Sequence, residues 1–477
     1  MVLAAGQGTR MKSRTPKVLH EVAERPLVSW VLHAAHQAGV ARTCAVLGHD
    51  RERVKARLQN CIDRLSLEFA YQEEQLGTGH AVRCALASIA ARKANDANPW
   101  ILILYGDCPL IRSEQLRRLV RETSKSGSDL GLFTCVVENP GAYGRILRQG
   151  GRVIGIREYK DCTEREREIR EVNPGVYLVR RSFLEQAIDA LTSDNVQGEL
   201  YLTDIVEAAA RASGAHDIQA PMTEFFGVND RADLAVCEQE MQSRIVAQHQ
   251  HAGVTFRSPK NVFVGAEVKI APDVTIEAGV ELRGQTVIES GAHIETGTIL
   301  SNATVRQNAH LKPYCVVAES EVGEHASVGP FAHLRSGTVL GSSSKIGNFV
   351  ETKKTTLGKE SKAGHLAYLG NGVIGERVNI GAGTIFCNYD GIQKHTTVLE
   401  DDVFIGSDSQ LVAPITVKRG AYVASGSTVT RDVPSDALAI SRVKQDNKEG
   451  YASRLRARFK GSQTPEDANS KTEKPSK

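Results

Sequence analysis

The sequence is poor in aromatic residues: Phe, Trp and Tyr together make up 5% of its 477 residues, with only two tryptophans. Its charges nearly cancel, since 59 basic and 56 acidic side chains give a net charge of +3. We therefore expect no nucleic-acid partner, because nucleic-acid-binding domains carry a strongly basic surface. No apolar run is long enough to span a bilayer, so we expect no membrane partner either.

The nine cysteines include no CxxC pair, and the first residues lack a charged leader with a cleavable apolar segment. These absences predict reduced thiols and a cytoplasmic location. The chain is also too long for one ordinary domain, so we expect two.

What the sequence does contain is a six-residue repeat from Val264 to Val429, in which an aliphatic residue is followed by a small or polar one. A period of six fits neither an amphipathic helix nor an alternating strand, but is typical of a left-handed parallel β-helix. Each coil should be a triangle of three short strands with one aliphatic side chain per face in the core. The repeat keeps three frames: Val264, Ile270, Ile276, Leu282, Ile288, Ile294 and Leu300; Val322, Val328, Leu334, Leu340 and Ile346; and Leu399, Ile405, Leu411, Val417, Val423 and Val429.

Two breaks interrupt this repeat. Ile346 and Ile374 are 28 positions apart and Phe386 and Leu399 are 13 apart, neither a multiple of six. Residues that do not fit a coil should loop out, and loops on a rigid scaffold often carry functional sites. The two breaks contain Lys353, His365, Tyr368, Asn388, Tyr389 and Lys394.

The first half of the chain alternates strand-like and helical patterns. We predict strands at 44–47, 67–71, 101–105, 130–137 and 175–179, and helices at 26–39, 79–92 and 113–126. Such alternation predicts a doubly wound, Rossmann-like α/β domain: a parallel sheet covered by helices on both faces, with its ligand site beyond the carboxyl ends of the strands.

A glycine-rich motif follows the first predicted strand. Residues 3–11 are Leu-Ala-Ala-Gly-Gln-Gly-Thr-Arg-Met, and Pro16 and Lys17 come soon after. Glycines let the backbone approach phosphates, while Arg10 and Lys17 supply positive charge. The third glycine of a dinucleotide fingerprint and a Walker-type Gly-Lys-Ser/Thr are both missing. A GxG alone would favour a plain turn, but the added cations favour a phosphate site.

These residues resemble the signature of sugar-1-phosphate nucleotidylyltransferases. The segments Gln75 to Ala81 (Gln-Leu-Gly-Thr-Gly-His-Ala) and Tyr105-Gly106-Asp107 look like that family's base-binding and metal-binding motifs. Together with the repeat, the chain to about Arg458 resembles the bifunctional bacterial N-acetylglucosamine-1-phosphate uridylyltransferase/glucosamine-1-phosphate N-acetyltransferases. The resemblance implies a nucleotidyltransferase domain, two reactions that make UDP-N-acetylglucosamine for peptidoglycan and lipopolysaccharide, Mg²⁺, the co-substrates UTP and acetyl-CoA, and a homotrimer.

The resemblance also assigns residues in the first half. Arg10 and Lys17 would neutralise phosphate charge during catalysis, and Asp107 and Asn229 would bind Mg²⁺ through hard oxygen atoms. Proline at 174 departs from the threonine that is usual in the family and removes an amide donor beside the sugar. By the same resemblance, Gln72, Gly77 and Thr78 would bind uracil, and Gly144, Glu158 and Asn173 would bind the sugar. The full set of nucleotide and sugar contacts would be Leu3, Ala4, Ala5, Gly6, Lys17, Gln72, Gly77, Thr78, Tyr105, Gly106, Asp107, Gly144, Glu158, Asn173 and Asn229.

In the repeat half, the resemblance makes His365 the general base that takes a proton from the sugar amine, with Glu351 as an orienting partner. Ser425 stands where the family more often has alanine. Glucosamine-1-phosphate would be held by Arg335, Lys353, Tyr368 and Asn379, and acetyl-CoA by Ala382, Asn388, Tyr389, Ser407, Ser425 and Arg442.

Four segments follow from these assignments: a uridylyltransferase domain at 1–228, a linker helix at 229–250, a β-helix acetyltransferase domain at 251–460, and a tail at 461–477. The linker should pack the stripe of Leu234, Cys237, Met241 and Ile245, with Asn229 or Asp230 as its cap. We expect residues 445–460 to form a basic helix and the polar tail to be disordered.

Three alternatives remain open at this stage. One is a nucleotidylyltransferase whose β-helix is only regulatory, and the second is a non-enzymatic scaffold, which the presence of Arg10, Lys17 and Asp107 disfavours. The third is a zinc β-helix enzyme, which needs three histidines on adjacent coils. The candidates His293, His310, His325, His333, His365 and His395 show no regular coil spacing in the sequence.

Overall fold

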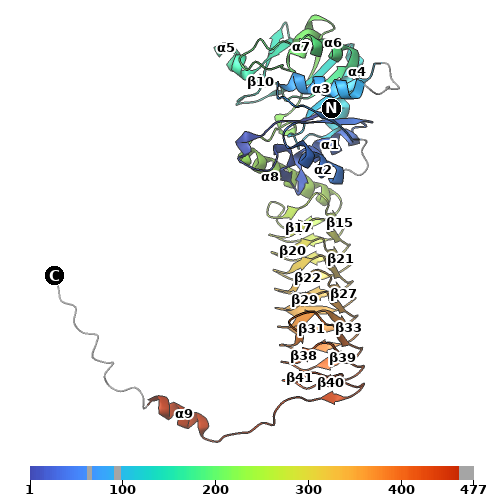
Figure 1. The fold of residues 1–477 in the computed structure, drawn as a ribbon, viewed down its shortest axis with the longest axis vertical. Helices are drawn as coiled ribbons and strands as arrows, with labels where there is room; N and C mark the ends of the chain where they lie inside the picture. Colours follow the sequence, from blue (N-terminus) through green and yellow to red (C-terminus); the bar gives the residue numbers. More distant parts are fainter. Residues whose placement is uncertain (62–66, 91–97, 461–477) are drawn as a thin grey trace, which may run out of the picture. The chain divides into compact units, whose positions relative to one another are not determined.

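The computed structural model describes residues 1–61, 67–90 and 98–460. The chain divides into two compact units, Met1–Ser343 and Ser344–Lys477. Figure 1 labels helices and strands of both units.

The first unit begins with a ten-stranded sheet in the order β5-β4-β1-β6-β11-β7-β10-β8-β9, with β12 paired to β7. The neighbours β5, β4, β1 and β6 are parallel, as predicted, and so is the pair of β7 and β12. Strand β11, however, runs antiparallel to both β6 and β7, so the predicted parallel sheet is in fact mixed. The strands are β1 (Val2–Ala4), β4 (Thr43–Leu47), β5 (Leu67–Tyr71), β6 (Trp100–Tyr105), β7 (Leu130–Val136), β8 (Arg145–Gln149), β9 (Arg152–Arg157), β10 (Glu171–Val172), β11 (Tyr177–Arg180) and β12 (Ala215–Gln219).

Helices cover both faces of this sheet, because its central strands bury alternate side chains on opposite sides. In β6, Leu102 and Leu104 pack in a core with α1, α2 and α4, whereas Ile101 and Ile103 pack with α3, α6 and α7. The helices are α1 (Leu27–Gln37), α2 (Arg51–Cys61), α3 (Thr78–Ala90), α4 (Ser113–Ser126), α5 (Glu164–Arg167), α6 (Arg181–Asp189), α7 (Asp204–Arg211) and α8 (Arg231–His251). The predicted helices at 26–39, 79–92 and 113–126 correspond to α1, α3 and α4, although residues 91–92 lie outside the described residues.

The long helix α8 begins at its predicted cap: the Asp230 carboxylate accepts hydrogen bonds from the amides of Ala232 and Asp233 at 2.9 and 3.0 Å. Its predicted stripe is confirmed as packing, since Cys237 and Met241 are buried. They join a third core formed with Met11, Val22, Ala23, Leu27, Leu110 and Val228. This core lies beneath the glycine-rich motif.

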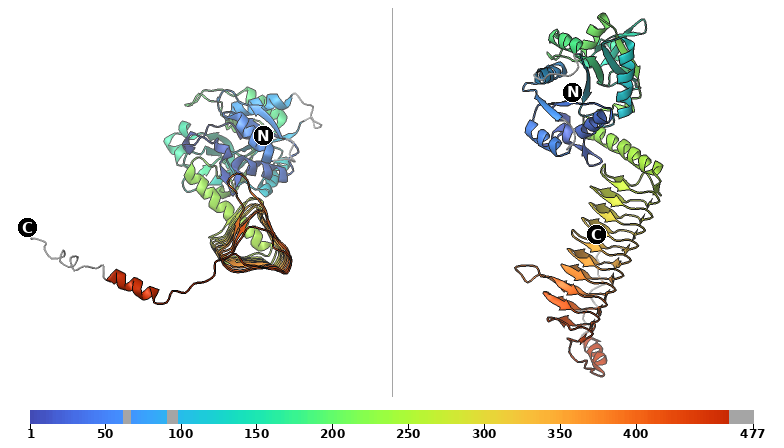
Figure 2. Two further views of the ribbon diagram at one scale, coloured as in Figure 1. Left: turned by 60° about the horizontal axis from the view of Figure 1, so that its bottom comes forward. Right: turned by 90° about the vertical axis from the view of Figure 1, so that its right-hand side faces the viewer.

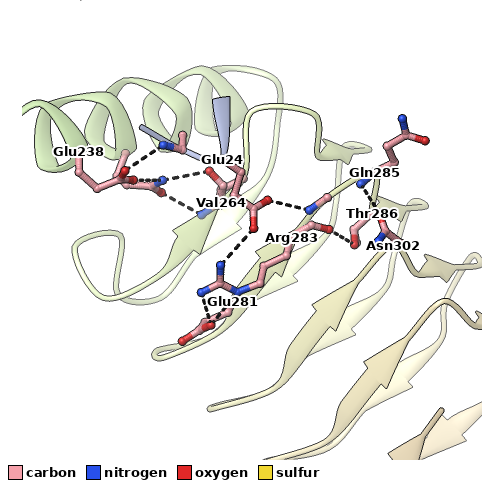
Figure 3. Close-up of polar contacts among 11 residues, drawn as sticks. Glu24, Glu238, Val264, Glu281, Arg283, Gln285, Thr286 and Asn302 are labelled. Carbon is pink, nitrogen blue, oxygen red and sulfur yellow. Dashed lines mark hydrogen bonds and ion pairs between the residues drawn. The ribbon is translucent and has the colours of Figure 1, made fainter. Parts of the chain in front are cut away.

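A hairpin, β2 (Glu21–Val22) and β3 (Arg25–Pro26), joins this core to the first coils of the β-helix (Figure 3). Its turn residues Ala23 and Glu24 have φ of +50° and +64°, which side-chain-bearing residues rarely adopt. The Glu24 carboxylate accepts hydrogen bonds from the amide of Gly284 at 2.7 Å and from Arg283 at 3.1 Å. The Ala23 carbonyl accepts a hydrogen bond from the Ala266 amide at 2.9 Å. The surrounding contacts therefore hold the strained turn in place.

The remainder of the first unit forms five turns of a left-handed parallel β-helix. Each core aliphatic residue of the first frame, from Val264 to Leu300, is buried as predicted. Parallel strands stack in three sheets: β13 (Thr255–Phe256), β16 (Thr275–Ile276), β19 (His293–Ile294), β22 (His310–Leu311) and β25 (Ser327–Val328); β14 (Phe263–Val264), β17 (Glu281–Arg283), β20 (Ile299–Ser301), β23 (Val316–Ala318) and β26 (His333–Leu334); and β15 (Lys269–Ile270), β18 (Val287–Ile288), β21 (Thr304–Val305), β24 (Glu321–Val322) and β27 (Val339–Leu340).

The second unit consists of further coils with the same triangular outline, visible in Figure 2. Its strands are β28 (Lys345–Asn348), β31 (Lys362–His365), β34 (Asn379–Ile380), β37 (Phe404–Ile405), β40 (Tyr422–Val423) and β42 (Leu438–Ala439); β29 (Glu351–Lys353), β32 (Tyr368–Gly370), β35 (Ile385–Cys387), β38 (Gln410–Val412) and β41 (Thr428–Val429); and β30 (Thr356–Leu357), β33 (Gly372–Ile374), β36 (Thr397–Leu399) and β39 (Ile415–Val417).

The prediction of a loop between Ile346 and Ile374 is wrong. Ile346 pairs with Ala363 and Leu357 pairs with Ile374, each 17 positions along the chain, so these residues stay in the coils. A coil of 17 residues shifts the six-residue frame by one without breaking the stack. The second predicted loop is confirmed, because the segment between β35 and β36 leaves the coil and closes through a bridge between Tyr389 and Lys394 (Figure 2).

After the coils, the predicted helix at 445–460 is shorter than expected: α9 spans Tyr451–Lys460. The tail at 461–477 lies outside the described residues. Among the residues that the structure describes, no helix is long and apolar enough to cross a membrane. The eight cysteines whose side chains are described are free thiols.

Candidate active sites

A cavity of about 240 Å³ opens at the carboxyl ends of β1 and β6. Parallel strands present their carboxyl ends at one edge, and the loops that follow β1, β5 and β6 therefore meet there. The cavity is lined by Leu3, Ala4, Ala5, Gly6, Lys17, Val18, Gln72, Gln75, Gly77, Thr78, Ala81, Tyr105, Asp107 and Glu199. Ten of these residues were predicted as nucleotide contacts from the sequence.

Two predicted oxygen ligands converge on one positive charge at this edge. The Lys17 ammonium donates to Asp107 Oδ2 at 2.5 Å and to Asn229 Oδ1 at 3.2 Å, and Arg10 donates to the same Asn229 oxygen at 2.9 Å. The amide of Val228 also donates to the Asp107 carbonyl at 2.9 Å, which ties the two segments together. A carboxylate and an amide oxygen aimed at a shared cation have the chemistry that a hard divalent metal ion requires.

The two glycines of the motif differ in what they allow. Gly8 has φ +63°, and a Cβ there would lie 2.5 Å from Lys17 Cβ, so only glycine lets the loop fold over the lysine stem. A Cβ on Gly6 would meet no atom of this chain within 4 Å. The absence of a side chain at Gly6 therefore leaves space in the cavity and is not required by the packing of the chain.

The side of the cavity next to α3 carries the predicted uracil contacts. Gln72 donates to the Gly77 carbonyl at 3.0 Å, and its side-chain nitrogen lies 3.2 Å from His80 Nδ1. Gly77 has φ +100°, and a Cβ there would lie 2.6 Å from the Leu200 carbonyl oxygen. The Thr78 hydroxyl accepts a hydrogen bond from the Leu202 amide at 3.1 Å. These contacts fix the loop in one shape beside the cavity.

The predicted sugar contacts Gly144, Glu158 and Asn173 lie near one another, and Glu158 lies near Tyr105. Burial and the nearby Glu158 carboxylate raise the pKa of Tyr105 well above its usual range, so its hydroxyl stays protonated. Burial also raises the pKa of Glu158, which accepts a hydrogen bond from Thr203 at 3.0 Å. A Cβ on Gly144 would lie 3.5 Å from the Glu158 carboxylate, and the Asn173 amide donates to the Gly144 carbonyl at 2.9 Å. Gly144, Glu158 and Asn173 are therefore close together in the structure.

Asn173 is buried and hydrogen-bonded at both ends of its amide group: its side-chain nitrogen donates to the Tyr177 hydroxyl at 2.6 Å, and its side-chain oxygen accepts from the Gly175 backbone amide at 3.0 Å. Gly175 has φ +83°, and a Cβ there would overlap the Tyr105 ring. Pro174 therefore sits in a turn whose shape the Asn173 side chain maintains.

Four lining residues, Val18, Gln75, Ala81 and Glu199, were not assigned from the sequence, and two of them are polar. Gln75 donates to the Ala5 carbonyl at 2.6 Å and so braces the glycine-rich loop. It belongs to the quoted base-binding segment, which was the available signal. Glu199 lies in a loop more than 100 residues after the cavity residues Gly77 and Thr78, so no motif near them in the sequence indicated it. A neighbouring cavity of about 470 Å³ shares Gln72 and Gln75 and adds Gln7, Gly48, His49, Asp50, Arg51, Glu52 and Glu73.

The candidate general base of the second unit lies in the coil rather than in a loop. His365 ends β31 with an exposed side chain, and its Nδ1 lies 2.6 Å from Asn348 Oδ1. An amide oxygen can only accept, so Nδ1 is the donor in this contact, and in the neutral ring Nε2 carries the lone pair. The partner of this nitrogen is Asn348, whereas Glu351 had been predicted. The 17-residue coil explains the difference, since it sets Asn348 beside His365.

His365 belongs to a column of side chains along one corner of the coils. Each member lies two positions after a core residue of the sheet that contains β28, β31, β34, β37 and β40. In chain order the column is Asn348, His365, Ala382, Ser407 and Ser425. The Ala382 carbonyl accepts from the Asp408 amide at 2.7 Å and the Ser407 carbonyl from the Gly426 amide at 2.8 Å, which fixes the spacing. The predicted base and three predicted acetyl-CoA contacts thus share one line.

Further predicted contacts lie beside this column. A Cβ on Gly370 would lie 2.6 Å from both the Tyr368 hydroxyl and the Asn388 amide nitrogen, so these two side chains meet over that glycine. The Asn388 amide also donates to Asn371 Oδ1 at 2.8 Å. Lys353 ends β29, the strand next to Tyr368 in the same sheet. Together they make a polar face beside His365.

Three other predicted residues of the second unit lie outside that face. Asn379 belongs to β34, in the sheet on the other side of the corner. Tyr389 is 60% exposed in the loop after β35, and its hydroxyl donates to the Gly391 carbonyl at 2.7 Å. Arg442 donates to the Ser425 carbonyl at 2.7 Å, at the end of the column. Arg335 belongs to the first unit, where its carbonyl accepts from Ser320 and Thr338.

Known protein families match parts of both halves of the chain. Residues 1–210 match the family of MobA-like NTP transferase domains, and residues 258–355 match the GMPPB C-terminal domain family. The chain is 51% identical to the bifunctional protein GlmU of Sorangium cellulosum over 465 residues, covering 96% of this chain and 97% of that protein. It is 45% identical to the GlmU protein of Geobacter sulfurreducens (96% and 98% covered) and 46% identical to that of Trichlorobacter lovleyi (96% and 98% covered). The chain therefore belongs to the family of the bifunctional protein GlmU, and it is a uridylyltransferase and an acetyltransferase in one chain.

Proposed function

We propose that the cavity at the carboxyl ends of β1 and β6 performs the uridylyl transfer. A phosphate oxygen of N-acetylglucosamine-1-phosphate attacks the α-phosphorus of UTP, and pyrophosphate leaves. The reaction requires no protein nucleophile, since its barrier is lowered by positioning and by neutralising charge. Arg10 and Lys17 supply that charge, and the convergence of Lys17, Asp107 and Asn229 is the observation that carries the assignment.

The divalent ion of this reaction is Mg²⁺ in our proposal, held by Asp107 and Asn229. Their two oxygen atoms already face one cation, the Lys17 ammonium, and hard oxygen donors with phosphate oxygens suit Mg²⁺. When bound, the ion neutralises phosphate charge. Lys17 then turns to the phosphates, while Gln72, Gly77 and Thr78 hold the uracil and Glu158 and Asn173 hold the sugar.

The acetyl transfer belongs to the second unit. His365 Nε2 takes a proton from the amine of glucosamine-1-phosphate as that amine attacks the acetyl thioester. Asn348 holds the ring with this nitrogen basic. Lys353, Tyr368 and Asn379 hold the sugar phosphate, and acetyl-CoA lies along Ala382, Ser407 and Ser425 with Asn388, Tyr389 and Arg442. The shared column is the observation that supports this arrangement.

A homotrimer completes the acetyl-transfer site in this proposal. His365 and Tyr389 are exposed, and Asn379 lies across a corner from Tyr368, so one chain offers an open surface. A neighbouring copy would close it and exclude water. The boundaries 1–228, 229–250 and 251–460 are proposed as the corresponding functional segments, and the cytoplasm as the location.

Product analysis tests the two steps and their order. The protein is incubated with glucosamine-1-phosphate, acetyl-CoA, UTP and Mg²⁺, and the products are identified by mass spectrometry. We expect N-acetylglucosamine-1-phosphate first, then UDP-N-acetylglucosamine and pyrophosphate. Leaving out acetyl-CoA should prevent UDP-sugar formation, and adding N-acetylglucosamine-1-phosphate should restore it. Uridylyl transfer without any acetyl transfer would instead favour a regulatory β-helix.

A further inference from the structure

Two histidines and two glutamates form a cluster on the outer face of the first unit's β-helix, away from the residues assigned above. His293 in β19 and His310 in β22 are directly paired neighbours on parallel strands. Their rings stack with centroids 5.1 Å apart and planes 1° from parallel. The sequence-based view that the histidines lack coil spacing is therefore wrong for this pair, because the coil here has 17 residues.

Each ring faces a carboxylate from the preceding coil. His293 Nε2 lies 3.1 Å from Glu277, and His310 Nε2 makes a short contact with Glu295. Glu277 is itself anchored, since it accepts hydrogen bonds from the Thr296 hydroxyl at 2.9 Å and the Thr296 amide at 3.3 Å. A carboxylate that is fixed in this way holds the orientation of the ring that it contacts.

The ligand atoms of His293, Glu295 and His310 all lie within 4.8 Å of one another. Bonds of 2.0 to 2.2 Å in tetrahedral geometry bring ligand atoms to about 3.4 Å, so side-chain rotations that move each atom by roughly an ångström would complete the site. All three side chains are half-buried and attached to paired strands, which limits the freedom lost on binding. Two imidazoles with a carboxylate select a borderline metal such as Zn²⁺ rather than Mg²⁺.

We propose that His293, Glu295 and His310 bind one Zn²⁺ that cross-links successive coils of the β-helix, with Glu277 orienting His293. Because its ligands come from neighbouring coils, the ion stabilises the fold. It is chemically distinct from the oxygen pair of Asp107 and Asn229.

Zinc binding to the full-length chain tests this proposal. The protein is stripped with a chelator, dialysed, and titrated with Zn²⁺ in excess Mg²⁺, while bound zinc and the thermal midpoint are measured. The variants His293→Gln and His310→Gln keep a donor for the facing glutamates but lose the imidazole. His333→Ala, which removes a histidine from a different sheet of the same unit, is the matched control.

We expect wild type and His333→Ala to bind Zn²⁺ and to gain thermal midpoint on binding. Each glutamine variant should bind at least tenfold more weakly and gain no midpoint, although its metal-free midpoint stays near that of wild type. Equal zinc affinity in all four proteins, or no binding at micromolar zinc, would overturn the proposal.

Cobalt distinguishes this site from the cysteines, which also bind soft metals. Co²⁺ in the proposed site should give visible absorption of a nitrogen and oxygen environment without the near-ultraviolet thiolate-to-cobalt band, and His310→Gln should abolish it. A thiolate band that survives in both glutamine variants would assign the metal to cysteine and contradict the proposal.

Discussion

At the scale of single residues, Gly6 and Gly8 are glycines for different reasons: Gly6 leaves space for substrate, and Gly8 allows the backbone conformation. Gly6→Ala adds a methyl group that meets no atom of the chain, whereas Gly8→Ala is strained at φ +63° and pushes against Lys17. We expect Gly6→Ala to keep the wild-type thermal midpoint and to lose uridylyl transfer by tenfold or more. Gly8→Ala should lower the thermal midpoint, because the strained backbone reduces the free energy of unfolding by about 1 kcal/mol or more. If Gly6→Ala lost stability and kept its activity, Gly6 would have no role in substrate space.

Glu158 makes stability depend on pH. Burial raises its folded pKa, so between the ordinary glutamate pKa of about 4.3 and this raised value the folded state binds more protons than the unfolded state. Stability is then fully present below the ordinary pKa and is lost as pH rises through the folded pKa. Glu158→Gln should therefore have a higher thermal midpoint than wild type at neutral pH, by a few degrees, and this advantage should shrink toward pH 4.

Exposed Glu164 on α5 provides the control for this measurement. Glu164→Gln should follow the wild-type pH profile. A Glu158→Gln midpoint that tracks wild type from pH 4 to 8 would mean that the Glu158 carboxylate is as well solvated in the folded chain as in the unfolded one.

Asn348 is a positioning residue for His365. Replacing its amide oxygen should leave Nδ1 without its acceptor, so we expect Asn348→Ala to lower the acetyl-transfer kcat while the KM for acetyl-CoA changes little. Asn348→Asp puts a negative charge beside the ring, and an opposite charge at this distance favours the protonated imidazole. The acidic limb of its kcat profile should therefore move to higher pH by about 1 unit or more. Unchanged pH profiles in both variants would reduce Asn348 to a packing role.

At the scale of elements, the β2–β3 hairpin couples the glycine-rich region to the first coils. Glu24→Ala removes the acceptor of the Gly284 amide and of Arg283, at a cost on the order of 1–3 kcal/mol. Glu24→Gly should cost less, because glycine relieves the strain at φ +64°. Hydrogen exchange at the amides of Gly284 and Ala266 reports the loosening directly.

The control is Glu267→Ala, which removes the exposed partner of Arg25 in the same junction. Exposed ion pairs contribute little, so exchange at Gly284 should stay near wild type. Similar loss of protection in Glu24→Ala and Glu267→Ala would show that the junction depends on general surface charge rather than on the docked turn.

Element by element, the sequence predicted what is periodic and missed what depends on partners. The buried frames from Val264 to Leu300 and from Leu399 to Val429 were visible because each core side chain recurs at a fixed step. The coils between Ile346 and Ile374 were misassigned because a 17-residue coil breaks the step without leaving the stack. The reversed direction of β11 was missed since a short apolar run such as Tyr177–Arg180 carries no sign of its orientation.

The candidate sites followed the same rule. Residues in contiguous motifs, such as Lys17, Thr78 and Asp107, were found because spacing alone brings them to one sheet edge. Asn348 was missed because its partner His365 lies one coil further along the chain. Glu199 was missed because other residues of its cavity, such as Gly77, lie more than 100 residues away in sequence. Their roles depend on register, which the sequence pattern specified only in part.

At the scale of the whole molecule, the helix α8 should decide how well the first part of the chain stands alone. Cys237 and Met241 cover Met11 and Leu27 beneath the glycine-rich motif. We expect a fragment of residues 1–251 to transfer uridylyl groups. A fragment of residues 1–228 should lose this activity because it lacks the proposed Mg²⁺ ligand Asn229, and it should have a lower thermal midpoint because it exposes this core. Neither should acetylate glucosamine-1-phosphate. Acetylation by either fragment, or equal midpoints, would contradict the proposed division.

The central claim is that one chain holds two chemically independent sites, and assaying both reactions on the same full-length preparations tests it most directly. Asp107→Ala should abolish Mg²⁺-dependent uridylyl transfer and leave acetyl transfer near the wild-type rate. His365→Ala should lower acetyl transfer by roughly 10²–10⁴-fold and leave uridylyl transfer from supplied N-acetylglucosamine-1-phosphate at the wild-type rate. Loss of both activities in either folded variant, or undiminished acetyl transfer in His365→Ala, would contradict the account.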